Sequence, residues 1–215
     1  MVQMRKFQFV FFLSVFFTLT VSGQNDPAAK VILDKFSAKA TSAPSVSMKF
    51  LIISTDKVQN TNDTLSGSIV LSKNSYKLDL PDNIIWFNGE TSWSYLPAEK
   101  EVTIAIPDKK DNSFQSKPAS IFTMYRTGYK NRLIEEKSDS YVIDLYPEDV
   151  KSDLIRVRLS IAKSSLTLKS CEYKRKDGLT MTLIVRDYNL KMVPEPGMFN
   201  FSPEKYKDTE VIDMR

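Results

Sequence analysis

The sequence predicts a mainly β protein in which one antiparallel sheet curls on itself. Apolar and polar side chains alternate along several segments, for example along residues 155–162, where Ile, Val, Leu and Ile alternate with Arg, Arg, Ser and Ala. Successive side chains of a strand point to opposite faces, so each such segment has one apolar face. Only two short segments beyond the N-terminus have a helical pattern, which is too little helix to cover so much apolar sheet. The sheet is therefore expected to curl, and a curled sheet can keep a cavity.

About eleven strands are expected. The same alternation marks residues 46–53, 141–146 and 180–186. Asn88-Gly89 and Asp177-Gly178 are strong hairpin signals, so neighbouring strands should be antiparallel. The expected strands are residues 46–57, 64–73, 75–80, 83–88, 90–96, 100–106, 129–136, 140–146, 153–162, 165–175 and 179–188.

The first expected helix begins at Asp26-Pro27, with Asp26 as N-cap and Pro27 in the first helical position. It should end between Thr41 and Pro44. Its apolar stripe consists of Ala29, Ile32, Leu33, Phe36 and Ala40.

The second expected helix spans residues 118–127 and stops at Gly128. A polar loop, residues 107–117, precedes it. A helix this short needs tertiary packing to persist. Its bulky apolar face is either a plug of the core or the inner surface of a mobile lid, and that face consists of Ile121, Phe122, Met124 and Tyr125.

The end of the chain has weaker signals. Residues 193–197 should be irregular because two prolines remove backbone donors. Residues 199–201 are expected to form a last short strand before a polar tail. No repeat or low-complexity linker interrupts the chain, so residues 24–215 are expected to form one domain.

The first 23 residues predict a secretory signal. Arg5 and Lys6 precede a mostly apolar stretch, residues 7–21, and small residues end it before a cleavage point ahead of Gln24. Translation could equally start at Met4. The alternative is an uncleaved membrane anchor, but the stretch is shorter than the roughly 20 residues that span a bilayer. No cysteine follows Gly23 for lipid attachment, so the exported chain is expected to be soluble after processing.

Composition excludes several function classes. The chain has no histidine, which removes His-dependent triads and His-containing zinc sites, and it has no phosphate-binding glycine loop. Its net charge is +4, or +2 without residues 1–23, and no basic block suggests nucleic acid. Cys171 is the only cysteine, so no internal disulfide can form. We expect no enzyme, no metal and no cofactor, and a monomer.

Several segments, in order, resemble the LolA-type periplasmic carriers of outer-membrane lipoproteins, especially the form found in Bacteroidetes-like bacteria. The resemblance covers essentially the whole processed chain. The segments that carry it are residues 26–35, 67–71, 76–81, 88–95, 118–125, 199–203 and 210–215.

This resemblance implies an unclosed antiparallel β-barrel whose concave apolar side is covered by two helices. It implies a carrier that is not an enzyme and that takes the acyl chains of lipoproteins into the hollow. The implied partners are acylated lipoproteins, an inner-membrane lipoprotein-releasing ABC transporter and the outer membrane, to which the cargo is delivered.

Strand parity and the second helix together predict the residues that line or border the hollow. They are Phe50, Ile69, Leu71, Trp93, Ile121, Phe122, Met124, Tyr125, Ile143, Val157 and Leu183. Proteobacterial members of the family have an arginine after the strand that corresponds to residues 67–71, and it ties the lid shut. This chain has Ser72-Lys73-Asn74 there. Lysine lacks the planar donor geometry of arginine, so Lys73 corresponds to that latch only in position.

Two other readings stay open. The chain could bind another amphiphile, such as a free lipid or a glycolipid. It could also be an envelope interaction or sensor domain whose cavity is a packed core, because one fold can host unrelated functions.

Overall fold

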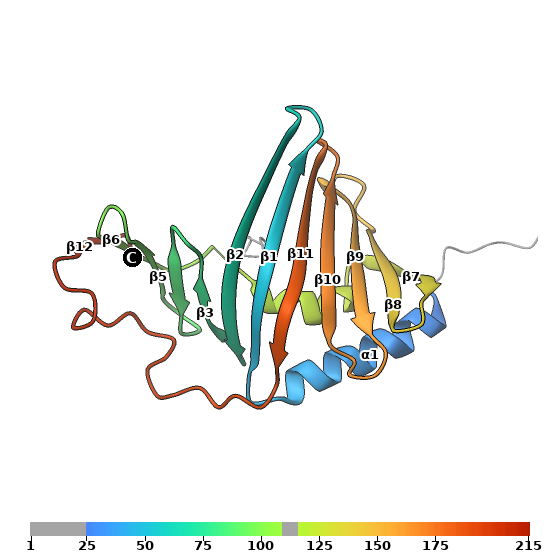
Figure 1. The fold of residues 1–215 in the computed structure, drawn as a ribbon, viewed down its shortest axis with the longest axis horizontal. Coiled ribbons are helices and arrows are strands. Elements are labelled where there is room, and N and C mark those ends of the chain that lie inside the picture. Colours follow the sequence, from blue (N-terminus) through green and yellow to red (C-terminus); the bar gives the residue numbers. More distant parts are fainter. Residues whose placement is uncertain (1–24, 109–115) are drawn as a thin grey trace, which may run out of the picture.

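The computed structural model describes residues 25–108 and 116–215, and these form one twelve-stranded sheet with a long helix and two short 3-10 helices against it (Figure 1). The predicted signal at residues 1–23, its cleavage point before Gln24 and most of the expected polar loop lie outside the described residues. In the described ranges, no helix combines the length and the apolar character needed to cross a membrane.

The sheet contains all eleven expected strands and one more. Neighbours run in the order β12-β6-β5-β4-β3-β2-β1-β11-β10-β9-β8-β7, and every pair is antiparallel except β12 with β6. The bounds are β1 Val46–Asp56, β2 Thr61–Ser72, β3 Ser75–Asp79, β4 Ile84–Phe87, β5 Ser92–Leu96, β6 Glu101–Ala105, β7 Tyr129–Glu136, β8 Ser140–Pro147, β9 Leu154–Ala162, β10 Leu168–Arg175, β11 Leu179–Asn189 and β12 Glu210–Asp213. The sheet is unclosed, as predicted, because β12 and β7 do not pair with each other.

Helix α1, Pro27–Ser42, forms as predicted. The Asp26 carboxylate accepts hydrogen bonds from the backbone N–H groups of Ala28 and Ala29, which satisfies two donors that the helix itself leaves free. The apolar stripe of α1 packs on one face of the sheet, which we call the inner face. The opposite face is the outer face.

The second predicted helix is two 3-10 helices, η1 Pro118–Phe122 and η2 Met124–Arg126. Thr123 separates them with a backbone φ of −130°, which no helix accommodates. We call residues 118–126 the 3-10 segment. It lies behind the sheet in Figure 1, on the same face as α1.

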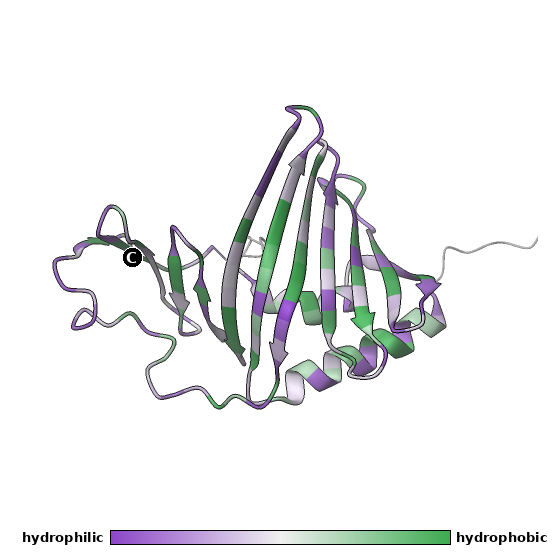
Figure 2. Cartoon of the chain, viewed as in Figure 1, coloured by the Kyte–Doolittle hydropathy of each residue, from purple (hydrophilic) through white to green (hydrophobic). Residues whose placement is uncertain are grey.

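The inner face carries the main apolar core. In β1, the side chains of Met48, Phe50 and Ile52 are buried on this face, and Lys49 and Leu51 alternate with them. Figure 2 shows how hydrophobic and hydrophilic residues alternate along the strands. Gly67 lies opposite Phe50 in β2, where a Cβ atom would come within 2.8 Å of the Phe50 ring. The glycine therefore makes room for that ring.

A second apolar cluster lies on the outer face of β4, β5 and β6. It buries Trp86, Tyr95 and Val102, and the C-terminal segment covers it with Phe201 and Tyr206. Residues 199–201 are therefore not the predicted strand but part of this cover. The polar tail, for which no strand was expected, supplies β12.

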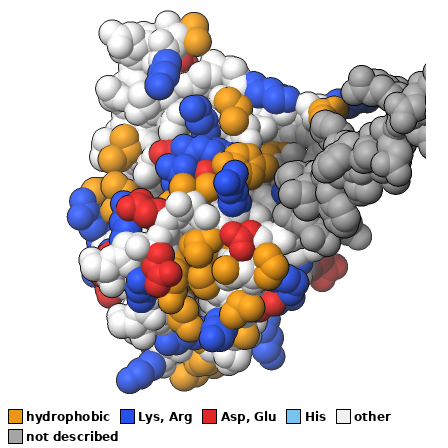
Figure 3. Space-filling view, turned by 90° about the vertical axis from the view of Figure 1, so that its right-hand side faces the viewer, with side chains coloured by type: hydrophobic (Ala, Val, Ile, Leu, Met, Phe, Trp, Pro, Cys, Tyr) orange, Lys and Arg blue, Asp and Glu red, His pale blue; other side chains and the backbone are white. Residues whose placement is uncertain are grey.

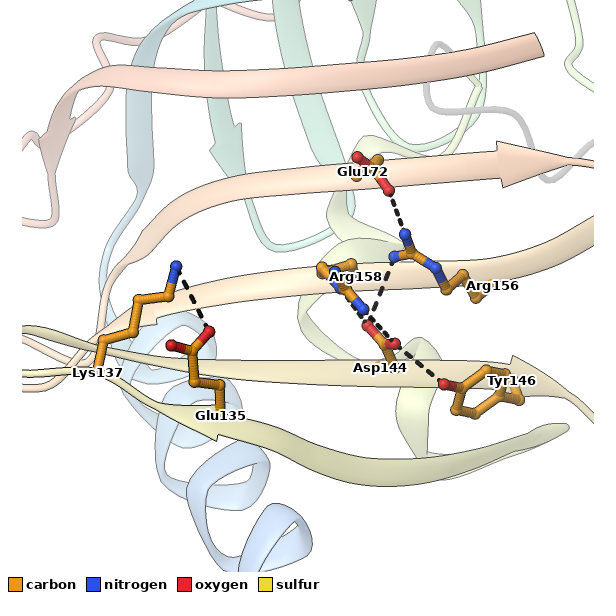
Figure 4. A network of polar contacts seen from close by, with 7 residues as sticks. All are labelled: Glu135, Lys137, Asp144, Tyr146, Arg156, Arg158 and Glu172. Carbon is orange, nitrogen blue, oxygen red and sulfur yellow. Dashed lines mark hydrogen bonds and ion pairs between the residues drawn. The ribbon is translucent and has the colours of Figure 1, made fainter. Parts of the chain in front are cut away.

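The outer face of β8, β9 and β10 carries a network of charges (Figure 4). Asp144 is almost fully buried there and accepts two hydrogen bonds from the Arg158 guanidinium, at 2.6 and 2.8 Å. Arg156 bridges Asp144 and Glu172, and the Tyr146 hydroxyl donates to Asp144. Burial acts to raise the pKa of Asp144, but these hydrogen bonds and the two arginine charges outweigh it and hold the pKa below its usual value.

Candidate lipid-binding site

A cavity of about 820 Å³ opens on the inner face between the C-terminal end of α1, the turn that joins β2 to β3, and the 3-10 segment. Its volume lies within the range of roughly 300–1,000 Å³ that is typical of small-molecule sites. The end of α1 contributes Ala40 and Thr41, and η1 contributes Pro118, Ala119, Ser120 and Phe122. The cavity is therefore bounded by strands on one side and by helical segments on the other.

The walls of the cavity are mainly apolar. Val46 of β1, Leu71 of β2, Tyr76 of β3 and Phe87 of β4 face it from neighbouring strands, and Phe122 faces them from the 3-10 segment. The cross-strand register brings Val46 opposite Leu71, Leu71 opposite Tyr76 and Tyr76 opposite Phe87, so these four side chains form one continuous row. The row offers dispersion contacts and no fixed polar pattern, which suits a flexible hydrocarbon.

Charged residues of both signs border the cavity: Lys73, Glu90, Asp108 and Lys117. Among the described lining residues, the two lysines balance the two carboxylates. The side of the molecule that carries β7 is mixed too, since Lys and Arg alternate there with Asp, Glu and hydrophobic side chains (Figure 3). The described part of the site therefore shows no excess of one charge sign that would favour an anionic or a cationic ligand.

Side-chain hydrogen bonds tie the 3-10 segment to α1, while its apolar side chains pack into the main core. The Tyr125 hydroxyl donates a hydrogen bond of 2.7 Å to Asp34, and the Arg126 guanidinium donates one of 2.9 Å to the hydroxyl of Ser37. Phe122 packs on Phe36, with ring centroids 5.4 Å apart. Hydrogen bonds from Lys30 and Tyr125 lower the pKa of Asp34, so the carboxylate that accepts the Tyr125 bond stays ionised at neutral pH.

The structure brings most of the predicted lining residues together in the main core. Leu71 and Phe122 line the cavity itself. Met124 packs against the core from a partly buried position. The other members found in that core are fully or almost fully buried: Phe50, Ile69, Ile121, Tyr125, Ile143, Val157 and Leu183. The 3-10 segment thus fills part of the inner hollow, and the open cavity remains beside it.

Trp93 is the exception, and its predicted place is wrong. The register pairs Trp93 with Trp86, which belongs to the outer cluster, so Trp93 lies on the outer face. In β5 the apolar parity, Trp93 and Tyr95, faces outward because the C-terminal segment covers that face, and the inner parity consists of Ser92 and Ser94. Parity within a strand identifies an apolar face but does not tell which side of the sheet it lies on.

Lys73 lies at the mouth of the cavity, in the turn between β2 and β3, with a positive φ of 51°. Among the described residues it forms no ion pair that would hold the 3-10 segment. The groups that do hold the segment, Asp34 and Ser37 with Arg126, were missed because a contact between separate helical segments leaves no local pattern. Tyr76 and Phe87 were also missed, although each lies on an alternating strand.

Comparison with known protein families identifies the family of this chain. The fold and the cavity define a binding protein of the open-barrel type. The family described as outer membrane lipoprotein carrier protein LolA matches residues 19–179, most of the chain, and the chain belongs to this family. Comparison with curated proteins finds no matching sequence.

Comparison with solved structures finds similar chains at low sequence identity. An uncharacterized conserved protein from Thermus thermophilus is 12% identical, with a TM-score of 0.54, and the match covers 86% of this chain and 99% of that one. A LolA superfamily protein from Nitrosomonas europaea is 14% identical with a TM-score of 0.43, over 80% of this chain and 97% of that one.

Proposed function

We propose that the processed chain, residues 24–215, is a periplasmic carrier that takes up the acyl chains of lipoproteins and brings them from the inner to the outer membrane. The observation that carries this proposal is the apolar cavity of about 820 Å³ beneath a segment held by few polar contacts. The family's description as lipoprotein carriers supports the cargo class. The proposed partners are acylated lipoproteins and a lipoprotein-releasing ABC transporter, and the proposed role involves no catalysis.

The energetics of the site fit loading and release without an energy source of its own. Each methylene that leaves water contributes about 0.8 kcal/mol, so a fully complementary cavity would hold a long acyl chain too tightly to release it. The cavity here is only part of the hollow, because Ile121, Phe122 and Tyr125 occupy the rest. Displacing these side chains and breaking their bonds to α1 costs free energy, which offsets part of the gain from acyl burial.

A release assay tests the proposal. The purified protein is added to vesicles that contain an acylated lipoprotein, its ABC transporter and ATP. We expect the lipoprotein to leave the vesicles in a soluble complex with this protein, and we expect the same lipoprotein without its acylated cysteine to form no complex.

Native mass spectrometry of protein purified from its own periplasm complements the assay. A co-purifying lipoprotein supports the proposal. A free lipid or glycolipid as the only bound species, together with failure in the release assay, would replace it with a carrier of another amphiphile.

A further inference from the structure

The free edge of β12 is an unusual feature of the sheet. β12 runs parallel to β6, and the N–H groups of Glu210 and Met214 donate to the carbonyl oxygens of Lys100 and Ile104, each at 2.8 Å. In a parallel pair, the N–H and C=O groups of one residue point to the same side of the strand, and those of the next residue point to the opposite side. Val211 and Asp213 therefore turn their N–H and C=O groups away from β6, to the side where no strand of the described chain pairs.

The opposite end of the sheet shows that this chain does cover an edge. At β7, the N–H groups of Asn131 and Leu133 donate to the side chains of Asn25 and Asp26, each at 3.0 Å. The N–H of Asp26 also donates to the carbonyl oxygen of Asn131. Exposed strand edges are usually blocked in this way, because an open edge is a template for another strand. Within the described residues, no segment covers the edge of β12 that points away from β6.

The open edge carries exposed apolar side chains beside the charged Glu210 and Asp213. Val211, Ile212 and Met214 are 54%, 38% and 68% exposed, whereas most large apolar side chains of the sheet are buried. The register pairs Val211 with Val102 of the outer cluster and Ile212 with Thr103, so Ile212 lies on the inner face. An incoming strand would find backbone partners at the edge and apolar contacts on both faces.

This edge is continuous with the cavity. Ile106 follows directly after β6, is 61% exposed and lines the cavity. Met214 is bonded to Ile104, two residues earlier. Among the described residues, the inner face of β5 and β6 carries small side chains toward the end that follows the cavity, namely Ser92, Ser94, Thr103 and Ala105, while the larger Leu96 and Glu101 lie at the far ends of these strands. A chain that leaves the cavity can reach the edge across this low surface.

We propose that the outer edge of β12 binds the polypeptide segment next to the lipid anchor of the cargo as an added β-strand. This inference rests on the proposed function, because the anchor in the cavity brings the segment to the edge. The occupant is a polypeptide because the free groups of Val211 and Asp213 are a backbone donor and acceptor pattern that an acyl chain cannot use. The cavity then binds the acyl anchor of the ligand, and the edge of β12 binds its polypeptide segment.

The test compares palmitate with a ten-residue peptide that carries a palmitoyl group at its N-terminus. Val211→Pro removes the outward N–H of β12 without removing a bond to β6, and proline is tolerated at such a position of an edge strand. Val211→Ala keeps that N–H and serves as the matched control. We expect Val211→Pro to weaken binding of the acylated peptide about fivefold relative to Val211→Ala, the effect of one backbone hydrogen bond, and to leave palmitate binding unchanged.

Hydrogen exchange on the unaltered protein gives a second readout that needs no variant. The amides of Val211 and Asp213 should exchange more slowly with the acylated peptide and at the same rate with palmitate. The inference is overturned if the two variants bind the acylated peptide equally well and the peptide does not protect these amides. Palmitate binding in the same experiment would still support the carrier function. A dimer of the unaltered protein that Val211→Pro dissociates would assign the edge to a second copy and also overturn it. If palmitate does not bind at all, the proposed function and the inference fail together.

Discussion

The hydroxyl of Tyr125 donates a hydrogen bond of 2.7 Å to the carboxylate of Asp34, and this contact joins the 3-10 segment to α1. Tyr125 is almost fully buried, whereas the Asp34 side chain is half-exposed and also pairs with Lys30. The contact therefore lies at the boundary between the core and solvent. Breaking it frees the segment on its solvent-facing side without exposing the sheet.

Tyr125→Phe removes this hydrogen bond and keeps the buried ring. We expect the variant to load an acylated peptide faster than the unaltered protein, because less free energy is needed to displace the segment. The free energy of unfolding should fall by about 1 kcal/mol. Tyr146→Phe is the matched control, since the Tyr146 hydroxyl donates to Asp144 on the outer face. Stopped-flow loading kinetics check the prediction, and equal rates in the two variants would contradict it.

Linking the segment to α1 should block loading. Asp34→Cys with Tyr125→Cys places two thiols where two side chains now meet, and a reducible bifunctional reagent can bridge them. We expect the bridged protein to load acylated cargo much more slowly, and reductant to restore the rate. The two single-cysteine variants, treated in the same way, control for modification itself. If the bridged protein loads as fast as the free form, the segment is a fixed plug of the core.

Phe122→Ala should separate the binding role of Phe122 from its packing role. Phe122 is buried against Phe36 and also lines the cavity, so its truncation should lower the free energy of unfolding by about 3 kcal/mol. A long-chain fatty acid should recover much of this loss by filling the enlarged cavity. Ile161→Ala, in the core but not at the cavity, should show no such recovery. Thermal unfolding with and without the fatty acid makes the comparison.

Asp144→Asn should destabilise the sheet by about 2–3 kcal/mol, because Arg156 and Arg158 lose the buried charge between them. Glu135→Gln, which weakens an exposed pair with Lys137, should have a much smaller effect. The pKa of Asp144 is lowered in the fold, so its contribution is present above the pKa of an unfolded aspartate, about 3.9, and is lost as the pH falls through the folded value. Urea unfolding between pH 5 and pH 2 should show the free energies of unfolding of the unaltered protein and of Asp144→Asn converging as the pH falls. A constant difference between the two would contradict this role of the Asp144 carboxylate.

Cys171 should be inert in the folded protein. Burial raises the pKa of this thiol to about 12, and its side chain belongs to the main core. We expect no reaction with a thiol reagent at pH 8 until the protein is denatured. Rapid labelling of the native protein would show that the core opens at this point. The same inertness keeps Cys171 out of the bridging experiment described above.

Much of this fold follows from local sequence, and the exceptions have physical reasons. All eleven expected strands formed, because alternation is a property of each strand alone. β12 was missed because its parallel pairing with β6 joins residues about a hundred positions apart. The 118–127 segment has helical spacing, but Thr123 lies outside helical geometry, so two 3-10 turns form in place of one helix.

The candidate site was predictable in its chemistry more than in its position. Strand parity and helical spacing found most of the side chains that meet in the main core, but they could not find which of them border empty space. Trp93 was misplaced because the C-terminal segment covers the outer face of β5, so the apolar parity of this strand does not mark the inner face. The contacts of the 3-10 segment with α1 depend on the packing of two separate segments, which no spacing rule encodes.

The pairing of β1 with β11 has a consequence for how the chain folds. β2 to β6 follow β1 directly in sequence, and β7 to β10 precede β11, so strands β1 to β11 form two sequential halves that pair only along this one seam. β12, which follows β11, is then added to β6 at the far edge of the first half. The seam pairs residues 47–56 with residues 179–189. A chain that crosses a membrane from its N-terminus onward delivers β1 long before β11 arrives. Until β11 arrives, the edge of β1 in the first half stays unpaired and exposed. Pairing of strands so far apart in sequence is slow. The first half of the sheet thus needs protection of the free edge of β1 until the last strands have emerged.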